Sequence, residues 1–450
     1  MSSMQLLPYK QQVSSLLRLG LPIVVGQLGM IILGLADTIM IGHHSTEELA
    51  AAAFVNNVFN LAIIFATGFS YGLTPLIGML QGGGNTQGIG RVFRNALAAN
   101  ASVAVLLTAV MYTVYCFVDK LGQPEELLPH IRPYFVLQLI SLLFIMLFNG
   151  FRQFAEGLTD TRTPMWILLG GNALNIFGNY LLIYGSFGFP EWGLFGAGVS
   201  TLVSRIVMLL VFIGVVAVAR RYKVYREAIL RSRFNRNDFI QLNALGWPIA
   251  LQMGMETAAF SLSAIMVGWL GSIPLAAHQI MISVSTIGFM VYYGMGAALA
   301  GRGSHFMGQK DFPNLRRAVN SGMGIILSLA IVASLFFYLV RTPIIYSFTE
   351  DHEVMIVVSS LIFSLIVYQF GDALQITFAN ALRGTTDVKP MMWIAFFSYF
   401  IVALPVGYLC GFTWGGGVVG VWVAFPAGLF TAGFLFWLRF RYRLQQLMKK

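Results

Sequence analysis

Residues 19–42 read LGLPIVVGQLGMIILGLADTIMIG, an apolar run that carries a single carboxylate, Asp37. A helix needs about 20 predominantly apolar residues to cross the hydrocarbon core of a membrane. The run is long enough to do so, and Asp37 is therefore predicted to lie within the membrane. A charge in that position costs roughly 2.5–3.5 kcal/mol on insertion scales, so an embedded carboxylate is a candidate functional residue.

The same pattern returns in the second half of the chain. Residues 245–268 read LGWPIALQMGMETAAFSLSAIMVG, with Leu-Gly-x-Pro-Ile at the start and Ile-Met-x-Gly at the end of both copies. The offset is kept further along, where Leu49–Ala51 matches Leu275–Ala277. Such constant register predicts two equivalent halves in parallel orientation, an arrangement of many secondary transporters, with the substrate path between the halves.

The composition of the 450-residue chain indicates a membrane protein. Hydrophobic residues make up 57% of it and charged residues 10%, whereas soluble domains carry about 25% charged residues. The net charge of +10 does not indicate nucleic-acid binding, because the basic residues lie in short segments between apolar runs. The first residues lack the charged, apolar and small-residue regions of a cleaved signal peptide, so none is expected.

The predicted fold is all-α and integral to the membrane, with twelve transmembrane helices in two pseudo-symmetric six-helix lobes. Turn-forming clusters such as Gly82–Asn85 separate the apolar runs. The predicted spans are approximately 14–42, 49–79, 92–118, 130–155, 164–187, 194–219, 239–270, 274–301, 316–340, 354–380, 390–412 and 417–439. The expected domains are an N-lobe over 1–219, a basic cytoplasmic linker over 220–238 and a C-lobe over 239–450.

Lysine and arginine predict the orientation. With the N-terminus inside, the outer segments hold only Lys120, Arg132 and Arg341, and nearly all other basic residues fall on inner segments. This distribution follows the positive-inside rule and places both termini in the cytoplasm. The basic linker is expected to lie at anionic lipid headgroups.

Three carboxylates are predicted to lie deep in apolar spans: Asp37, Glu256 and Asp372. The repeat aligns Asp37 with Ser263 and Glu256 with Met30, so these acids do not form a symmetric pair. Arg205 is the one base predicted within a span and can neutralise at most one of them. The remaining acids must be protonated or paired with a mobile cation, as in proton or Na⁺ exchange.

Other polar groups accompany these acids. Tyr368 lies one helical turn before Asp372 and is expected to hydrogen-bond its carboxylate, or else to be an ordinary packed tyrosine. Asn172, Asn175 and Asn179 follow one helix face, where they either line a wet cavity near Asp37 or join helices. No P-loop or soluble-enzyme motif is found in the sequence, and an enzyme is not expected.

These residues resemble the MATE (multidrug and toxic compound extrusion) transporters, most closely the NorM-type branch. The resemblance covers essentially the whole length. It rests on Leu19–Ile23 with Asp37, on the loop pair Asp160–Met165 and Asp387–Met391, on Ala276–Ile280, and on Glu256 with Asp372. Residues 383–387, Arg-Gly-Thr-Thr-Asp, are a looser version of the family's loop motif.

The resemblance implies a secondary active antiporter with alternating access. It would export bulky cationic or amphipathic drugs in exchange for Na⁺ or H⁺, with no cofactor, as a monomer among the lipids of a bacterial-type inner membrane. Asp37, Asn175 and Asn179, with Asn172 on the same face, are expected to form the N-lobe polar site. Glu256, Tyr368 and Asp372 are expected to form the C-lobe cation site, with Glu256 and Asp372 as Na⁺ ligands if the protein is sodium-coupled.

Two questions stay open at this point. The alternative function is a flippase or exporter of a lipid-linked or amphipathic metabolite, although such cavities are expected to be basic and this one is acidic. The coupling ion, Na⁺ or H⁺, is also undecided.

Overall fold

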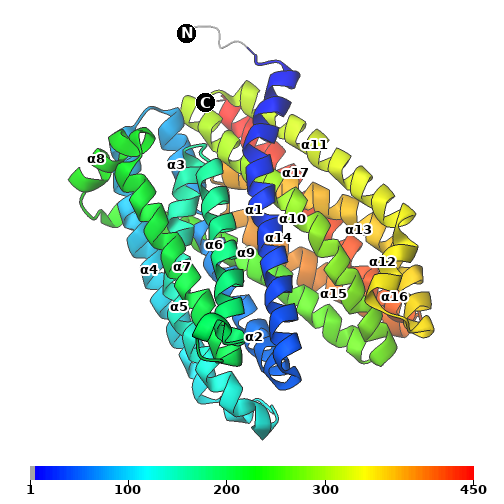
Figure 1. The fold of residues 1–450 in the computed structure, drawn as a ribbon. Helices are drawn as coiled ribbons and strands as arrows, with labels where there is room; N and C mark the ends of the chain where they lie inside the picture. Colours follow the sequence, from blue (N-terminus) through cyan, green and yellow to red (C-terminus); the bar gives the residue numbers. More distant parts are fainter. Residues whose placement is uncertain (1–5, 450) are drawn as a thin grey trace. The chain divides into compact units, whose positions relative to one another are not determined.

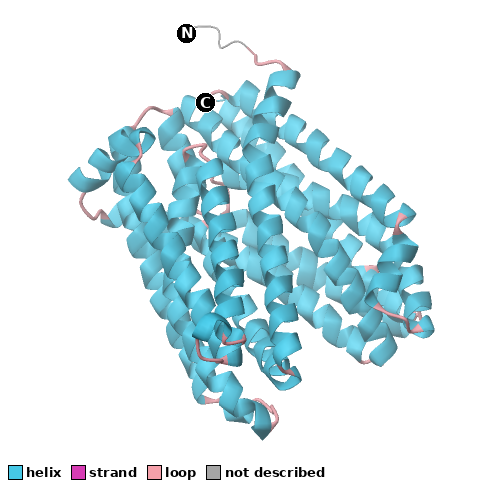
Figure 2. Ribbon diagram, viewed as in Figure 1, coloured by secondary structure: helices cyan, strands magenta, loops and turns pink. Residues whose placement is uncertain are grey.

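The computed structural model describes residues 6–449, and every regular element among them is helical (Figure 2). Within this described range, twelve helical segments are long and apolar enough to cross a membrane, which confirms the predicted all-α membrane fold. These segments are Tyr9–His44, Thr46–Gly82, Thr86–Cys116, Glu125–Gly157, Arg162–Ile183, Gly193–Val218, Arg236–Gly268, Ser272–Gln309, Phe312–Leu339, His352–Gly384, Lys389–Thr413 and Gly417–Lys449.

The chain forms two compact units. The first unit comprises residues 25–250, and the second comprises residues 1–24 with 251–450. The division falls within two helices, α1 (Tyr9–His44) and α9 (Arg236–Gly268), at equivalent points of the repeat. The lobe and linker boundaries expected from the sequence stay a prediction.

The first unit packs its helices around an apolar core. Its complete helices are α2 (Thr46–Ser70), α3 (Leu73–Gly82), α4 (Thr86–Cys116), α5 (Leu128–Gly157), α6 (Arg162–Ile183), α7 (Gly193–Val218) and α8 (Lys223–Arg231). Helices α4, α5 and α7 run side by side, with α5 in contact with both of the others (Figure 1). The rings of Phe59 and Phe135 meet edge to face in the core, 4.8 Å between centroids. This contact joins α2 to α5 in the core of the unit.

The second unit is centred on a long helix. Its complete elements are α10 (Ser272–Gln309), α11 (Phe312–Leu339), α12 (Arg341–Phe348), α13 (His352–Gly384), α14 (Lys389–Phe396), η5 (Phe397–Ala403), α15 (Leu404–Tyr408), η6 (Leu409–Thr413), α16 (Gly417–Trp422) and α17 (Ala424–Lys449). Helix α13 packs against α10, α11 and α17. Its buried side chains therefore face several neighbouring helices.

Prolines mark three interruptions of the predicted spans. Proline has no N–H to donate to the carbonyl four residues earlier and clashes with it. Pro75 follows the break between α2 and α3, and Pro426 follows the break between α16 and α17. The eleventh span is irregular in another way, because η5 and η6 are π-helical turns on either side of α15, which contains Pro405. Pro22 and Pro248 instead lie inside the continuous helices α1 and α9.

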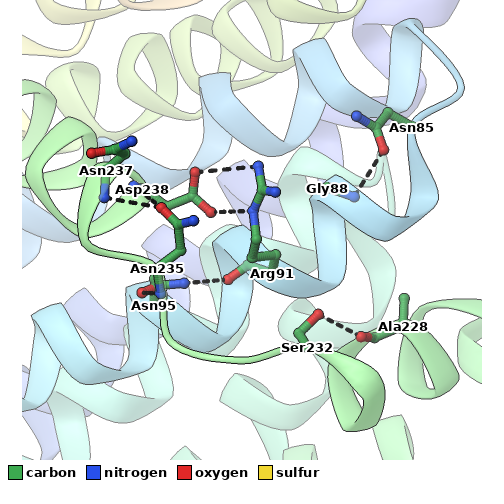
Figure 3. A network of polar contacts seen from close by, with 9 residues as sticks. All are labelled: Asn85, Gly88, Arg91, Asn95, Ala228, Ser232, Asn235, Asn237 and Asp238. Atoms are coloured by element: carbon green, nitrogen blue, oxygen red, sulfur yellow. Dashed lines mark hydrogen bonds and ion pairs between the residues drawn. The ribbon is translucent and has the colours of Figure 1, made fainter.

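The basic linker is folded onto the first unit. Arg91 of α4 donates through Nε to Asp238 at 2.6 Å, and Asn95 accepts from the backbone N–H of Asn235 at 3.0 Å (Figure 3). Tyr222 donates to Asp160 at 2.6 Å. Burial and the neighbouring Asp160 charge raise the pKa of Tyr222, so its hydroxyl stays protonated as the donor. Polar contacts therefore hold both ends of α8.

Candidate functional site

Asp37 of α1 is held by asparagines of α6. Asn179 donates to Asp37 Oδ1 at 2.5 Å. When the Asn175 amide is turned so that its nitrogen faces Asp37, it donates to the same oxygen at 3.0 Å and accepts from Thr201 Oγ1 at 3.1 Å. Asn175 and Asn179 are 1% and 0% exposed, so solvent cannot replace these contacts. We call Asp37, Asn175, Asn179 and Thr201 the Asp37 cluster.

The helical spacing explains this arrangement. Asn175 and Asn179 are four residues apart, so both amides lie on one face of α6. Asn172 shares that face but lies beside Gly29 of α1, and its amide nitrogen has no hydrogen-bond partner among residues 6–449. The structure therefore brings Asn175 and Asn179 to Asp37, while Asn172 lies farther along the helix pair.

A guanidinium lies next to this cluster. Arg205 of α7 is one helical turn after Thr201 and donates to Gln138 Oε1 of α5 at 3.1 Å and to Ser141 Oγ. Tyr134 of α5, which donates to Asn56 at 3.2 Å, interacts electrostatically with both Asp37 and Arg205. The first unit thus holds one carboxylate and one guanidinium within a shared polar region.

Glu256 of α9 lies in a second polar region, in the second unit. Its Oε2 accepts from Gln252 Nε2 at 2.9 Å and from Gln375 Nε2 at 3.1 Å. Gln252 also accepts from Arg383 Nη2 at 2.8 Å, so a guanidinium is linked to Glu256 through one amide. A small cavity is lined by Glu256, both glutamines and Arg383. Arg383 is buried here, although its position in the sequence predicts an inner-surface residue.

Asp372 of α13 receives no hydrogen bond from the part of the chain that the structure describes. Its side chain is 1% exposed, and neither carboxylate oxygen has a hydrogen-bond partner among residues 6–449. It interacts electrostatically with Glu256 and with the hydroxyls of Tyr292, Tyr368 and Tyr399. A buried carboxylate without donors is stable only when it is protonated or paired with a cation. We call these five residues the Asp372 cluster.

The expected hydrogen bond from Tyr368 to Asp372 does not form. Tyr368 lies one turn before Asp372, but its ring packs edge-on against Phe260 and Phe425, with centroids 6.2 and 6.4 Å away. Packing of this large ring decides where its hydroxyl points. Tyr368 therefore belongs to the cluster without donating to the acid.

Several residues in the polar region around Glu256 are not predicted from the sequence. Gln252 and Gln375 had a detectable signal, since each lies one helical turn from a predicted acid. Tyr399 had none. It is 2% exposed and belongs to the π-helical turn η5, and its approach to Glu256 depends on how that turn packs.

Comparisons with known proteins match both halves of the chain. The family model described as MatE matches residues 22–181 and 248–409, so its two matches begin at the two equivalent prolines. The chain is 30% identical over 448 residues to the multidrug resistance protein NorM of Photobacterium profundum, covering 96% of each chain.

Solved structures share the fold. An outward-facing multidrug resistance MATE family transporter of the MOP superfamily has a TM-score of 0.88 at 21% identity, covering 98% of this chain and 97% of that one. A mutant of the Vibrio cholerae MATE transporter VcmN has a TM-score of 0.88 at 18% identity, covering 98% and 99%.

Proposed function

The chain belongs to the MatE family, and we propose that it is a multidrug efflux antiporter that exports bulky cationic or amphipathic compounds in exchange for Na⁺ or H⁺. The relative from Photobacterium profundum carries a multidrug resistance name, which supports this cargo class. The protein is a transporter rather than an enzyme. It spans the membrane many times, and we place it in a bacterial-type inner membrane with both termini in the cytoplasm, as a monomer surrounded by lipid.

The environment of Asp372 is the single observation that supports coupling of drug export to an ion. Two unbonded carboxylate oxygens, fully buried near a second carboxylate, favour a bound proton or a hard cation. Oxygen atoms from carboxylates, hydroxyls and amides suit such an ion. Binding it neutralises the cluster, and releasing it leaves charge in a buried site.

Exchange requires two conformations with different affinities. A ligand shifts a conformational equilibrium only as far as its affinities for the two states differ. In our proposal the Asp372 cluster holds the coupling ion in one state and releases it in the other. The Asp37 cluster contributes a carboxylate to the drug site of the first unit.

A vesicle assay tests this function. The purified protein is reconstituted, a Na⁺ or pH gradient is imposed, and movement of a fluorescent organic cation is followed. We expect gradient-driven movement that falls to the rate of protein-free vesicles in Asp372→Asn and Glu256→Gln. Glu227→Gln, which alters an exposed acid of α8, is the matched control. Full transport by both site variants would exclude the proposed coupling, and comparison of the two gradients identifies the ion.

A further inference from the structure

His44, the last residue of α1, lies between two carboxylates at one end of the first unit. Its Nδ1 is 2.8 Å from Glu48 Oε2 of α2, and its Nε2 is 3.0 Å from Glu191 Oε1 in the segment before α7. A neutral imidazole has one N–H and one bare nitrogen, whereas an imidazolium donates from both nitrogens. Both contacts to ionised carboxylates are therefore hydrogen bonds only when His44 carries a proton on each nitrogen.

The two carboxylates differ in their surroundings. The Glu48 side chain is 9% exposed, and its Oε2 also accepts from the backbone N–H of Leu194 at 2.9 Å. A Cβ added at Gly193 would overlap Glu48 Oε1, so this glycine leaves the space that the carboxylate occupies. The Glu191 side chain is 66% exposed. A buried carboxylate depends on donors from the protein, whereas water solvates an exposed one.

Loss of one proton from His44 therefore breaks a defined contact. The remaining proton is favoured on Nδ1, because that nitrogen faces the buried Glu48. Nε2 then turns a bare lone pair toward an oxygen of Glu191, and the two groups repel each other. Histidine is the side chain whose charge ordinarily changes between pH 5 and 8. The hydrogen bond to Glu191 is thus present while the imidazole is charged and is lost as the pH rises.

The other titratable groups near His44 do not share this position. The ring of Tyr184, just after α6, has its centroid 6.3 Å from the imidazole, and its hydroxyl donates to a backbone carbonyl of α1 at 2.8 Å. His130 of α5 lies on the other side of the buried acid, with Nδ1 3.8 Å from Glu48 Oε1. His43 is exposed. Among these three histidines, only His44 contacts both carboxylates.

The contact to Glu191 fastens the segment that joins α6 to α7. We call residues 184–192 the α6–α7 loop. One backbone hydrogen bond, from the N–H of Trp192 to the carbonyl of Leu182 at 2.8 Å, connects its two ends. The bond between Glu191 and His44 also joins the loop to the ends of α1 and α2.

We propose that His44 is a proton-binding site that controls the α6–α7 loop: the imidazolium holds the loop through Glu191, and deprotonation releases it. In the proposed orientation this end of the first unit faces the outside, so the external pH is the signal. The site is distinct from the Asp372 cluster and from the Asp37 cluster, which lies two helical turns earlier on α1. It requires neither the cargo nor the coupling ion proposed above, so failure of drug export would leave it intact.

Hydrogen exchange of the purified full-length protein in lipid nanodiscs tests this inference. Amide exchange of the α6–α7 loop is measured at about pH 5.5 and about pH 8.5, on either side of the range in which histidine titrates. Each rate is divided by the intrinsic exchange rate at the same pH. In the wild type we expect loop protection to be about tenfold lower at the higher pH, as for loss of a hydrogen bond between charged groups.

Four variants identify the responsible group. His44→Gln cannot become charged, so its loop should show low protection at both pH values. Glu191→Gln should show nearly equal protection at both, because an amide accepts from an N–H and also donates to a bare ring nitrogen. His43→Gln alters the exposed neighbouring histidine and is the matched control, which should behave like the wild type. His130→Gln should also keep the pH dependence.

Equal loop protection at the two pH values in the wild type would overturn the inference. A pH dependence that persists in His44→Gln would overturn it as well, because another group would then be the sensor. Exchange in α13, which belongs to the second unit, shows whether each variant is folded. If His44→Gln also loses protection there, Glu191→Gln decides, since it changes an exposed side chain. A wild-type pH dependence in Glu191→Gln would then reject the proposed contact.

Discussion

At the scale of single residues, the first unit shows how a carboxylate is held within a membrane. Asn179 and Asn175 supply N–H groups to Asp37, and Thr201 supports Asn175 from a third helix. Hydrogen bonds to charged groups contribute about 1.5–3 kcal/mol each. The carboxylate is thus fixed in position, while one of its oxygens is left for a ligand.

Two asparagines of α6 provide a matched pair of variants. Asn179→Ala removes the 2.5 Å donor to Asp37, and we expect the affinity for an organic cation to fall about tenfold. Asn172→Ala deletes the same amide on the same helix face but does not remove a contact to Asp37. Its effect should be clearly smaller. Equilibrium binding of a fluorescent cation to the purified variants measures both affinities. An equal loss of affinity in the two variants would contradict the hydrogen bond from Asn179 to Asp37.

Helical periodicity accounts for some of the observed side-chain placements and not for others. Spacings of three and four residues place Asn175 and Asn179 on one face, and the same rule places Tyr368 above Asp372. In the first case the polar side chains reach their partner. In the second, the aromatic ring follows the apolar contacts with Phe260 and Phe425, which no local rule describes.

At the scale of elements, the π-helical turn η5 brings a new residue to the Asp372 cluster. π-helical turns are rare and occur often at functional sites. Tyr399 of this turn is 2% exposed, and its hydroxyl lies near Glu256 without a hydrogen bond among residues 6–449 that meets ordinary geometry. The hydroxyl is therefore a candidate oxygen for the coupling ion.

Removing that one oxygen tests the role of η5. We expect Tyr399→Phe to raise the Na⁺ or H⁺ concentration needed for half-maximal drug export several-fold, because the ring stays and only the ligand atom is lost. The comparison is Tyr408→Phe in α15, an exposed tyrosine of the same span. An unchanged ion dependence in Tyr399→Phe would assign the hydroxyl to packing alone.

The contact between α4 and α8 is unusually close. A Cβ added at Gly90 would lie 2.4 Å from the carbonyl carbon of Ala228, a backbone atom that cannot move independently. Gly90 therefore allows the linker helix to pack against α4. The sequence predicts the linker from its charge, but this docking depends on a tertiary contact that charge does not specify.

Gly90→Ala is expected to loosen the linker. Overpacking of this type costs roughly 1–3 kcal/mol, so trypsin should cut the arginine-rich segment 220–236 faster and the thermal midpoint should fall. Gly170→Ala in α6 is the control, because its added Cβ would meet no atom within 4 Å. Similar proteolysis of both variants would argue against a docked α8.

At the scale of the whole molecule, the repeat predicts much of the fold but not the distribution of function. The recurrence of residues 19–42 at 245–268 indicates two equivalent halves, and the apolar runs with the turn-forming clusters between them correctly predict twelve spans. The compact units are nevertheless divided within α1 and α9. Packing between distant helices decides this division, and a pattern read along one chain does not contain it.

The two units carry different sets of polar groups on a shared scaffold. The Asp37 cluster pairs its acid with amides, whereas the Asp372 cluster gathers two acids and three tyrosine hydroxyls. Amide donors hydrogen-bond the carboxylate of the first site, whereas Asp372 in the second site has no hydrogen-bond donor among residues 6–449 and needs a proton or cation. This difference predicts that drug recognition and ion binding can be lost separately.

Charge-neutral variants of the two acids should separate these activities. We expect Asp37→Asn to weaken drug binding about tenfold while binding of radiolabelled sodium, or release of protons on drug addition, is kept. Asp372→Asn should abolish ion binding and gradient-driven export, yet purified protein should still bind the drug, because the Asp37 cluster is intact. The double variant should lose both. If each single substitution removes drug and ion binding alike, the clusters form one functional site and the assignment of separate roles is wrong.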